Sequence, residues 1–263
     1  GSMKAYAVQL NCRWEKKEAN FSRVLRLLDD KRIQPGSLIV LPETFATGFS
    51  MNLDKTIPGE PELTKAYLSE LSSTLKCWVM GGMVAPAEDS DKGRNLSATF
   101  DPEGKEIASY AKIQPATIYQ EDEKHQAGKK VEVFSIPGFT VCPLICYDLR
   151  FPELFRIGMQ KKADLFVVIA CWPKVRIEHW ITLLRARAIE NLSFVLGVNR
   201  TGKDPNLEYG GKSLIIDPKG NILADGGEAE GILEADLHAC SVKDWRKEFP
   251  ALIHAKTEFL PPL

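Results

Sequence analysis

A nearly continuous apolar run from Leu165 to Cys171 is the feature that most constrains how this chain can fold. The run has the length of a strand, and it lacks the alternation of a strand that faces water on one side. Such runs are typical of strands that are buried on both faces of their sheet. Other layers of structure are therefore needed to cover both faces.

Helical and strand-like segments surround this run along the chain. Apolar residues recur at helical spacing in residues 15–30, in residues 62–76 and from Glu178 to Leu192. Helices alternate with strands early on and hairpins are interleaved throughout, which predicts a layered α/β or α+β sandwich. The other predicted strands are Lys4–Leu10, Ser37–Pro42, Trp78–Val84, Leu96–Phe100, Ile107–Ala111, Val131–Ile136, Thr140–Ile145, Phe194–Val198, Lys212–Ile216 and Gly231–Ala235.

Length and composition fit one folding unit. The chain has 263 residues, 44% of them hydrophobic, and it shows no linker, low-complexity tract or repeat of solenoid period. We therefore predict a single domain over residues 1–263. Gly1-Ser2-Met3 resembles the remnant of a cleaved expression tag and is left out of the fold prediction. Residues 244–263 form a tail with an apolar end, which we expect to pack on its own domain or on a neighbouring subunit.

The composition also argues against nucleic acid, membranes and metal ions as partners. The formal net charge is −1, which offers no basic surface to nucleic acid or to an anionic membrane. No apolar run approaches the roughly 20 residues that span a bilayer, and no signal peptide opens the chain, so we expect a cytoplasmic protein. The six cysteines are then expected to be reduced. Cys142 and Cys146 lack a nearby pair of His or Cys to complete a metal site, and we predict no metal and no cofactor.

Three polar residues stand where an apolar run gives way to a loop. Glu43 follows residues 37–42, Lys112 follows residues 107–111, and Cys146 follows residues 141–145. Taken singly, each has an ordinary explanation, since Glu and Lys are mostly exposed and free Cys is mostly buried. Taken together they make chemical sense: a carboxylate takes the proton of a thiol, and an ammonium stabilises first the thiolate and then an oxyanion.

The segments around these residues resemble a known family. Leu41–Phe45, Tyr110–Lys112 and Leu144–Glu153 are similar to the three signature segments of the nitrilase (carbon–nitrogen hydrolase) superfamily, in the family's order. The likeness covers roughly residues 4 to 250. It continues through Ala170–Pro173, Arg185–Asn191, Val198–Gly202 and the stretch from Gly211 to Gly220.

This resemblance implies a four-layer αββα sandwich that pairs into an αββα–αββα homodimer. It implies Glu43 as general base, Cys146 as nucleophile and Lys112 as the group that stabilises the transition state. The backbone N–H of Tyr147 would be a second oxyanion donor. A further glutamate, counted back from a glycine in the family pattern, falls on Glu121, with Glu123 as the alternative. It would orient the lysine and exchange hydrogen bonds with the substrate amide.

Within the superfamily, residues 44–51, residues 121–128 and Cys171-Trp172-Pro173 look most like the omega-amidase branch. The resemblance implies a small-molecule substrate, the side-chain amide of a 2-oxo acid such as 2-oxoglutaramate. Such a substrate carries a distant carboxylate, which needs a charge-assisted partner. Arg176 is the candidate partner. Phe45, Tyr147 and Trp172 are expected to wall the pocket.

Several alternatives stay open from the sequence. The same three residues serve a carbamoylase, an aliphatic amidase or a nitrilase, and a binding protein that had lost catalysis would keep the fold. Gln114-Pro115 stands where many family members have a histidine, so the loop after Lys112 is expected to differ in shape. Asp148, Arg150 and Glu153 are expected to form a buried ion-pair network that holds the turn of the nucleophile.

Overall fold

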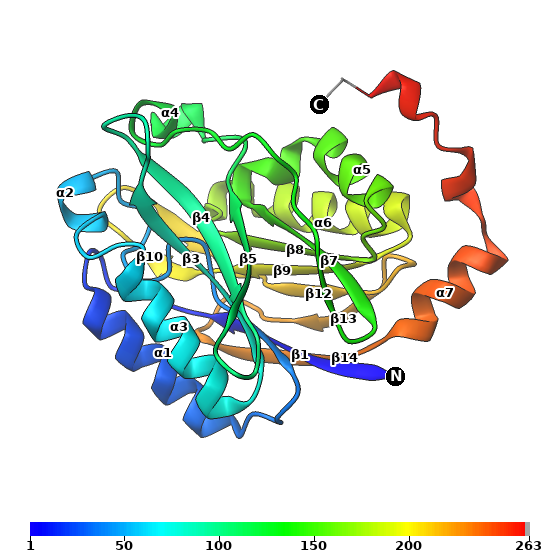
Figure 1. Cartoon of the computed structure of the whole chain (residues 1–263), viewed down its shortest axis with the longest axis horizontal. Coiled ribbons are helices and arrows are strands. Elements are labelled where there is room, and N and C mark those ends of the chain that lie inside the picture. The colour runs from blue at the N-terminus through cyan, green and yellow to red at the C-terminus, as the bar shows by residue number, and fades with distance from the viewer. Residues whose placement is uncertain (261–263) are drawn as a thin grey trace.

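Two six-stranded sheets stack face to face, and a pair of helices covers the outer face of each (Figure 1). The computed structural model describes residues 1–260. Helices α1 (Lys17–Lys31) and α3 (Glu62–Leu75) lie on one sheet, and α5 (Pro152–Gln160) and α6 (Ile177–Asn191) lie on the other. The predicted αββα sandwich is confirmed. Its helix α5, which opens with a proline at its first position, was not anticipated as an element.

The first sheet has the strand order β14-β1-β2-β3-β4-β5. Its strands are β1 (Ser2–Gln9), β2 (Leu38–Val40), β3 (Trp78–Pro86), β4 (Gly93–Phe100), β5 (Glu106–Ala111) and β14 (Gly231–His238). Ser2 and Met3, which the sequence analysis set aside, pair with His238 and Leu237. They belong to the first strand because the antiparallel partner β14 runs on far enough to pair with them.

The second sheet has the order β13-β12-β9-β8-β7-β6. Its strands are β6 (Phe134–Ile136), β7 (Phe139–Ile145), β8 (Leu165–Ala170), β9 (Phe194–Asn199), β12 (Leu214–Ile216) and β13 (Ile222–Asp225). Every residue of β8 is buried, as its apolar run predicted. Because β7, β8 and β9 run parallel, the residues that follow them meet at one edge of the sheet.

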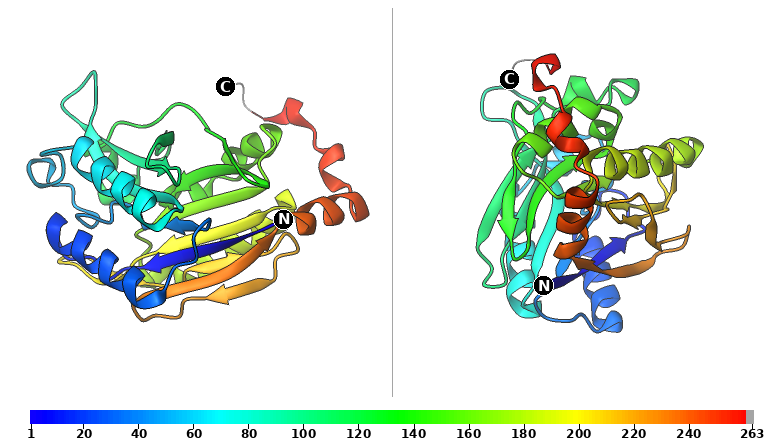
Figure 2. Two further views of the ribbon diagram at one scale, coloured as in Figure 1. Left: turned by 60° about the horizontal axis from the view of Figure 1, so that its bottom comes forward. Right: turned by 90° about the vertical axis from the view of Figure 1, so that its right-hand side faces the viewer.

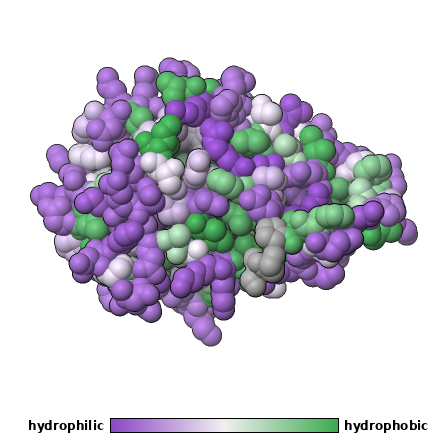
Figure 3. Space-filling view, turned by 90° about the horizontal axis from the view of Figure 1, so that it is seen from above, coloured by the Kyte–Doolittle hydropathy of each residue, from purple (hydrophilic) through white to green (hydrophobic). Residues whose placement is uncertain are grey.

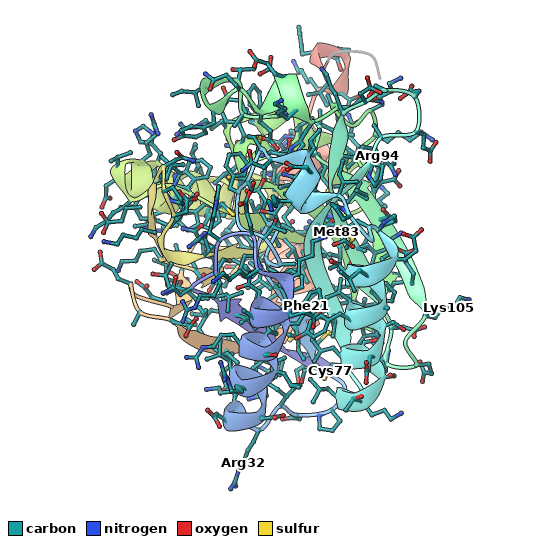
Figure 4. The ribbon with its side chains drawn as sticks, turned by 90° about the vertical axis from the view of Figure 1, so that its left-hand side faces the viewer. Phe21, Arg32, Cys77, Met83, Arg94 and Lys105 are labelled. Carbon is teal, nitrogen blue, oxygen red and sulfur yellow. The ribbon has the colours of Figure 1, made fainter. Side chains whose placement is uncertain are left out.

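Aromatic side chains fill the layer between the first sheet and its helices. Phe21 of α1 stacks on Tyr67 of α3 with ring centroids 4.3 Å apart, and Phe45 lies 5.9 Å from Phe21. Figure 4 shows α1 and α3 side by side on this face, with Phe21 on the inner side of α1. This packing holds the start of the loop after β2 against the helices.

Short elements join these layers. They include α2 (Leu53–Thr56), α4 (Glu121–Lys124) and a separate hairpin of β10 (Thr201–Lys203) and β11 (Glu208–Gly210). Within residues 1–260, no helix is long and apolar enough to cross a membrane.

The chain ends in a segment that leaves the body of the sandwich (Figures 1 and 2). Helix α7 (Ala239–Glu248) starts it, and two single turns, Ala251–His254 and Thr257–Phe259, continue it. Arg246 anchors α7 by donating to the carbonyl oxygens of Ala163, Asn191 and Leu192. A guanidinium suits this place because the end of a helix such as α6 presents unpaired carbonyls. Residues 261–263 of the predicted tail lie outside the described residues.

Candidate active site

Glu43, Lys112 and Cys146 each follow a different strand. Glu43 lies in the loop after β2, Lys112 follows β5 directly, and Cys146 follows β7 directly. The two sheets face each other, so loops from both meet at one end of the sandwich. The structure brings the three side chains together there: Lys112 contacts Glu43 directly, and Cys171 connects them to Cys146, because its N–H donates to Glu43 and its carbonyl oxygen accepts from the thiol.

The lysine ammonium lies between two buried carboxylates. Its Nζ is 2.8 Å from Oε2 of Glu43 and 2.7 Å from Oε1 of Glu121. Burial opposes the charge of Lys112, but the carboxylates of Glu121 and Glu43 outweigh it and hold the lysine pKa well above its ordinary value. Lys112 is therefore a fixed cation. Between the two glutamates left open by the sequence, Glu121 is the buried one and Glu123 is exposed.

Cys146 sits at a sharp change of backbone direction, where β7 gives way to a 3-10 turn over Cys146–Arg150. Its φ of +48° lies in the left-handed region, which is uncommon for a residue other than glycine and recurs at functional sites. The thiol is 8% exposed and donates to the carbonyl oxygen of Cys171 at 3.8 Å. Burial and the charge of Glu43 raise the pKa of Cys146, with Lys112 opposing them, so the resting group is a thiol.

Neutral donors hold Asp148 in the turn that begins at Cys146. Oδ2 of Asp148 accepts the Tyr110 hydroxyl at 2.6 Å and the N–H of Ile145 at 3.0 Å, and Oδ1 accepts the N–H of Gln114 at 2.9 Å. In the described part of the chain neither Asp148, Arg150 nor Glu153 takes part in a salt bridge. The predicted ion-pair network is therefore wrong, because three neutral donors already satisfy this buried carboxylate.

A cavity of about 330 Å³ opens onto Cys146. Tyr147, Trp172 and Arg176 line it, as the sequence analysis expected of the pocket. Nη1 of Arg176 donates to the hydroxyl of Tyr119 at 2.7 Å. A second guanidinium, that of Arg150, lies over the ring of Trp172 at 4.9 Å and also lines the cavity. A volume of this size suits a small organic molecule.

Phe45 does not line this cavity. It is fully buried in the layer between the first sheet and its helices, among Phe21 and Tyr67. The phenylalanine of this loop that lines the cavity is Phe49, whose ring centroid lies 5.4 Å from Nζ of Lys112. The expected role of Phe45 is therefore corrected, because the turn that follows Glu43 aims residue 45 inward and residue 49 at the site.

Several site residues were missed from the sequence. Asn95 of β4 donates through Nδ2 to Oε2 of Glu43 at 2.7 Å and to Oε2 of Glu121 at 3.0 Å. The N–H of Cys171 donates to Oε1 of Glu43 at 2.9 Å, and Cys171 lines the cavity. Asn95 lies just before the predicted strand Leu96–Phe100, so no pattern in the sequence marked it, and only the structure shows its amide nitrogen paired with two buried carboxylates. Residues 1–260 contain no group of three or more His, Cys, Asp or Glu side chains arranged to hold a metal ion.

Comparison with known proteins agrees with this geometry. The sequence model of the carbon-nitrogen hydrolase family matches residues 4–247. The chain is 36% identical to a 2-oxoglutaramate amidase of Bacillus subtilis, over 84% of this chain and 85% of the relative. It is also 36% identical to the omega-amidase YafV of Yersinia enterocolitica, over 94% of each.

Solved structures share the fold. XC1258 of Xanthomonas campestris, described as a CN-hydrolase superfamily protein with an arsenic adduct in its active site, superposes with a TM-score of 0.90. It is 31% identical, and the superposition covers 97% of this chain and 98% of that one. With a family match over most of the chain and an acid, an ammonium and a thiol brought together at one cavity, this protein belongs to the carbon–nitrogen hydrolase family, the nitrilase superfamily, in its omega-amidase-like branch.

Proposed function

We propose that the protein is an omega-amidase, which hydrolyses the side-chain amide of a 2-oxo acid such as 2-oxoglutaramate, or of a short dicarboxylate monoamide. The observation that carries the proposal is the buried Glu43–Lys112 pair beside Cys146, at a cavity that also holds two arginines. Relatives named 2-oxoglutaramate amidase and omega-amidase support the choice of substrate.

In the first half-reaction Glu43 takes the proton of Cys146, and the thiolate attacks the amide carbon. The carbonyl oxygen becomes an oxyanion, which Lys112 and the backbone N–H of Tyr147 stabilise. When this intermediate collapses, the carbon–nitrogen bond breaks and the proton held by Glu43 goes to the leaving nitrogen. Ammonia is released and a thioester remains on Cys146.

In the second half-reaction water replaces ammonia. Glu43 takes a proton from the water as its oxygen attacks the thioester carbon. The carbon–sulfur bond then breaks, the sulfur takes the proton back from Glu43, and the product acid leaves. The fixed charge of Lys112 serves both half-reactions, because each passes through an oxyanion at the same place.

We propose that Arg150 and Arg176, which line the cavity, bind the end of the substrate that lies away from the amide. A carboxylate there forms a charge-assisted hydrogen bond with a guanidinium. Arg176 is the proposed partner, and its bond to Tyr119 already aims it along the cavity wall. Arg150 offers a second guanidinium, since within residues 1–260 neither arginine pairs with a carboxylate.

Ammonia release from a panel of amides tests this function. The purified protein is expected to release ammonia from 2-oxoglutaramate much faster than from a neutral amide of similar length, while Cys146→Ala abolishes the release. Arg176→Gln is expected to raise KM for 2-oxoglutaramate at least tenfold and to leave the neutral amide unaffected. Equal rates on both amides, or retained activity in Cys146→Ala, contradict the proposal. N-carbamoyl amino acids and nitriles in the same panel separate the other activities of this superfamily.

A second candidate substrate class is an amide with a larger substituent on nitrogen. A neighbouring cavity of about 380 Å³ shares Phe49, Ile118 and Tyr119 with the first. A relative in Synechocystis, 33% identical over 95% of this chain, is named deaminated glutathione amidase. Faster hydrolysis of N-substituted amides than of 2-oxoglutaramate would favour this class.

We also propose that the protein works as a homodimer in the cytoplasm. Ile253 and Phe259 of the C-terminal segment are 76% and 81% exposed, and apolar side chains in such positions suit a contact with a second copy. Seen from above, the end of the molecule that carries this segment shows hydrophobic patches among hydrophilic side chains (Figure 3). A thiol nucleophile suits a reducing compartment, and all six cysteines are free thiols.

A further inference from the structure

We propose that His125 is a positioning residue whose N–H occupies the last free hydrogen-bond acceptor site of Glu121. Of the two carboxylates beside Lys112, only Glu43 then has a free acceptor site with which to take a proton. The inference rests on the proposed function. It gives the two glutamates that flank Lys112 different tasks: one anchors the ammonium, and the other is the base.

Glu121 accepts four hydrogen bonds. Oε1 accepts from Nζ of Lys112 at 2.7 Å and from the N–H of Ala116 at 2.7 Å. Oε2 accepts from Nδ2 of Asn95 at 3.0 Å and lies 2.7 Å from Nδ1 of His125. An ionised carboxylate offers about four acceptor sites, so Glu121 has none left for a substrate or a proton.

Glu43 accepts three hydrogen bonds from the described residues. Oε2 accepts from Asn95 and Lys112, whereas Oε1 accepts only from the N–H of Cys171. One acceptor site on Oε1 therefore stays open. Of the two carboxylates, Glu43 is the one that can take the proton of Cys146 without first giving up a bond.

The tautomer of His125 follows from its partner. Burial works against the charge of Glu121, but Lys112 and His125 outweigh it and keep the pKa of Glu121 well below its usual range. An ionised carboxylate only accepts, so Nδ1 of His125 carries the proton. The ring is 1% exposed, and among the described residues Nε2 has no hydrogen-bond partner. Among the described residues the ring therefore makes one hydrogen bond, from Nδ1 to Glu121.

The elements around Glu121 show why the fourth donor matters. His125 follows α4 and stands one helical turn beyond Glu121, while the other titratable groups, Glu43, Lys112 and Cys146, approach from the ends of β2, β5 and β7. Without the imidazole N–H, Asn95 is the only donor left to Oε2, while Lys112 and the N–H of Ala116 still bind Oε1. The carboxylate is then oriented less firmly, and so is the ammonium that it anchors beside Cys146.

Two variants distinguish the effect of the imidazole N–H donor from the effect of the space that the ring fills. His125→Asn places an amide N–H near the position of Nδ1, whereas His125→Leu fills similar space without a donor. We expect His125→Leu to lower kcat about 10- to 100-fold with KM changed less than threefold, because the displaced ammonium stabilises the transition state poorly. His125→Asn is expected to keep kcat within about fivefold of the wild type. Rates are measured on whichever amide the wild type hydrolyses best.

A second measurement does not depend on a substrate. The rate at which iodoacetamide alkylates Cys146 follows the thiolate fraction, which Lys112 increases. Its pH midpoint is expected to rise in His125→Leu and to stay near the wild-type value in His125→Asn. The proposed function fails if the wild type hydrolyses no amide, whereas the role of His125 fails if these midpoints do not separate.

Nitrogen-15 NMR of histidine-labelled wild-type protein reads the tautomer directly, and the signal that is missing from the His125→Asn spectrum is assigned to His125. We expect Nδ1 of His125 to carry a proton, because it lies 2.7 Å from a carboxylate oxygen. A proton on Nε2 alone would overturn the proposal, as would equal losses of kcat in His125→Asn and His125→Leu.

Discussion

At the residue scale, the site is built from side chains whose hydrogen-bonding capacity decides what they can do. Lys112 is held by two carboxylates, and Asn95 bridges the same two carboxylates from β4, the strand that pairs with β5. Thr44 and Cys146 both have positive φ, at +42° and +48°, and they stand beside or at the proposed base Glu43 and the proposed nucleophile Cys146. Such backbone strain persists only where surrounding contacts fix it, as the bond from the N–H of Ile145 to Asp148 does next to Cys146.

Asp148 carries a prediction about pH at this scale. Burial raises the pKa of Asp148 from 3.8 to about 6. A carboxyl with a raised pKa in the folded state favours folding most below its unfolded pKa, and this contribution is lost as the pH rises from about 4 to 6. About two pH units at about 1.4 kcal/mol each give a loss of roughly 3 kcal/mol.

Urea unfolding of the wild type and of Asp148→Asn between pH 4 and 7.5 measures this loss. The stability of the wild type relative to the variant is expected to fall by about 2 to 3 kcal/mol over that range, because the variant cannot ionise. A difference that stays constant with pH would show that Asp148 has an ordinary pKa in the folded protein.

At the element scale, the central strands allow the loops of the site to approach closely. Gly82 lies in the middle of β3, below the loop that carries Glu43. A Cβ at this position would stand 2.7 Å from the backbone nitrogen of Thr44 and 3.0 Å from Cα of Glu43. Since backbone atoms cannot move aside like the end of a side chain, this strand needs glycine here.

Gly82→Ala is therefore expected to push the loop of Glu43 out of place. We expect it to lower kcat/KM at least tenfold and to cost about 1 to 3 kcal/mol of unfolding free energy, as overpacking does. Gly231→Ala in β14 is the matched control, because a Cβ there meets nothing within 4 Å. Amide hydrolysis and urea unfolding check both variants; equal activity in the two would refute the close approach as the reason for glycine.

At the scale of the whole molecule, helices cover the outer faces of both sheets, but part of the C-terminal segment leaves its apolar side chains exposed. Arg246 ties α7 to the end of α6, and beyond it the chain presents Phe249, Ile253 and Phe259 to the surroundings. Ala239 and Val242 of α7 pack into the core, but the two single turns that follow bury no residue. The exposed apolar side chains of this segment are consistent with the proposed contact between two copies.

A double variant tests that contact. Ile253→Asp with Phe259→Asp is expected to turn a dimer into a monomer while the melting temperature of the monomer fold changes little, because both side chains are exposed within one chain. Lys256→Asp, between them, is the control for added charge. Light scattering after gel filtration gives the mass of each form, and a monomeric wild type would rule the dimer out.

The sequence by itself determined the layers and the placement of the chemistry along the chain. Periodicity located α1, α3, α6 and the apolar strand β8, since local patterns report which face of an element is buried. The motifs around Glu43, Lys112 and Cys146 then pointed to one family and one kind of reaction. These are statements about neighbours in the chain, which a sequence records directly.

Only the tertiary structure decided which side chains meet. It placed Phe49 instead of Phe45 at the cavity and surrounded Asp148 with neutral donors. It also brought Asn95 and His125 to Glu121. The physical reason is that, apart from the one helical turn between Glu121 and His125, these contacts join residues far apart in the chain, whose distance depends on loop turns and on how strands and sheets are arranged. A hydrogen bond is made or lost over a few tenths of an ångström, a precision that no periodicity in a sequence carries.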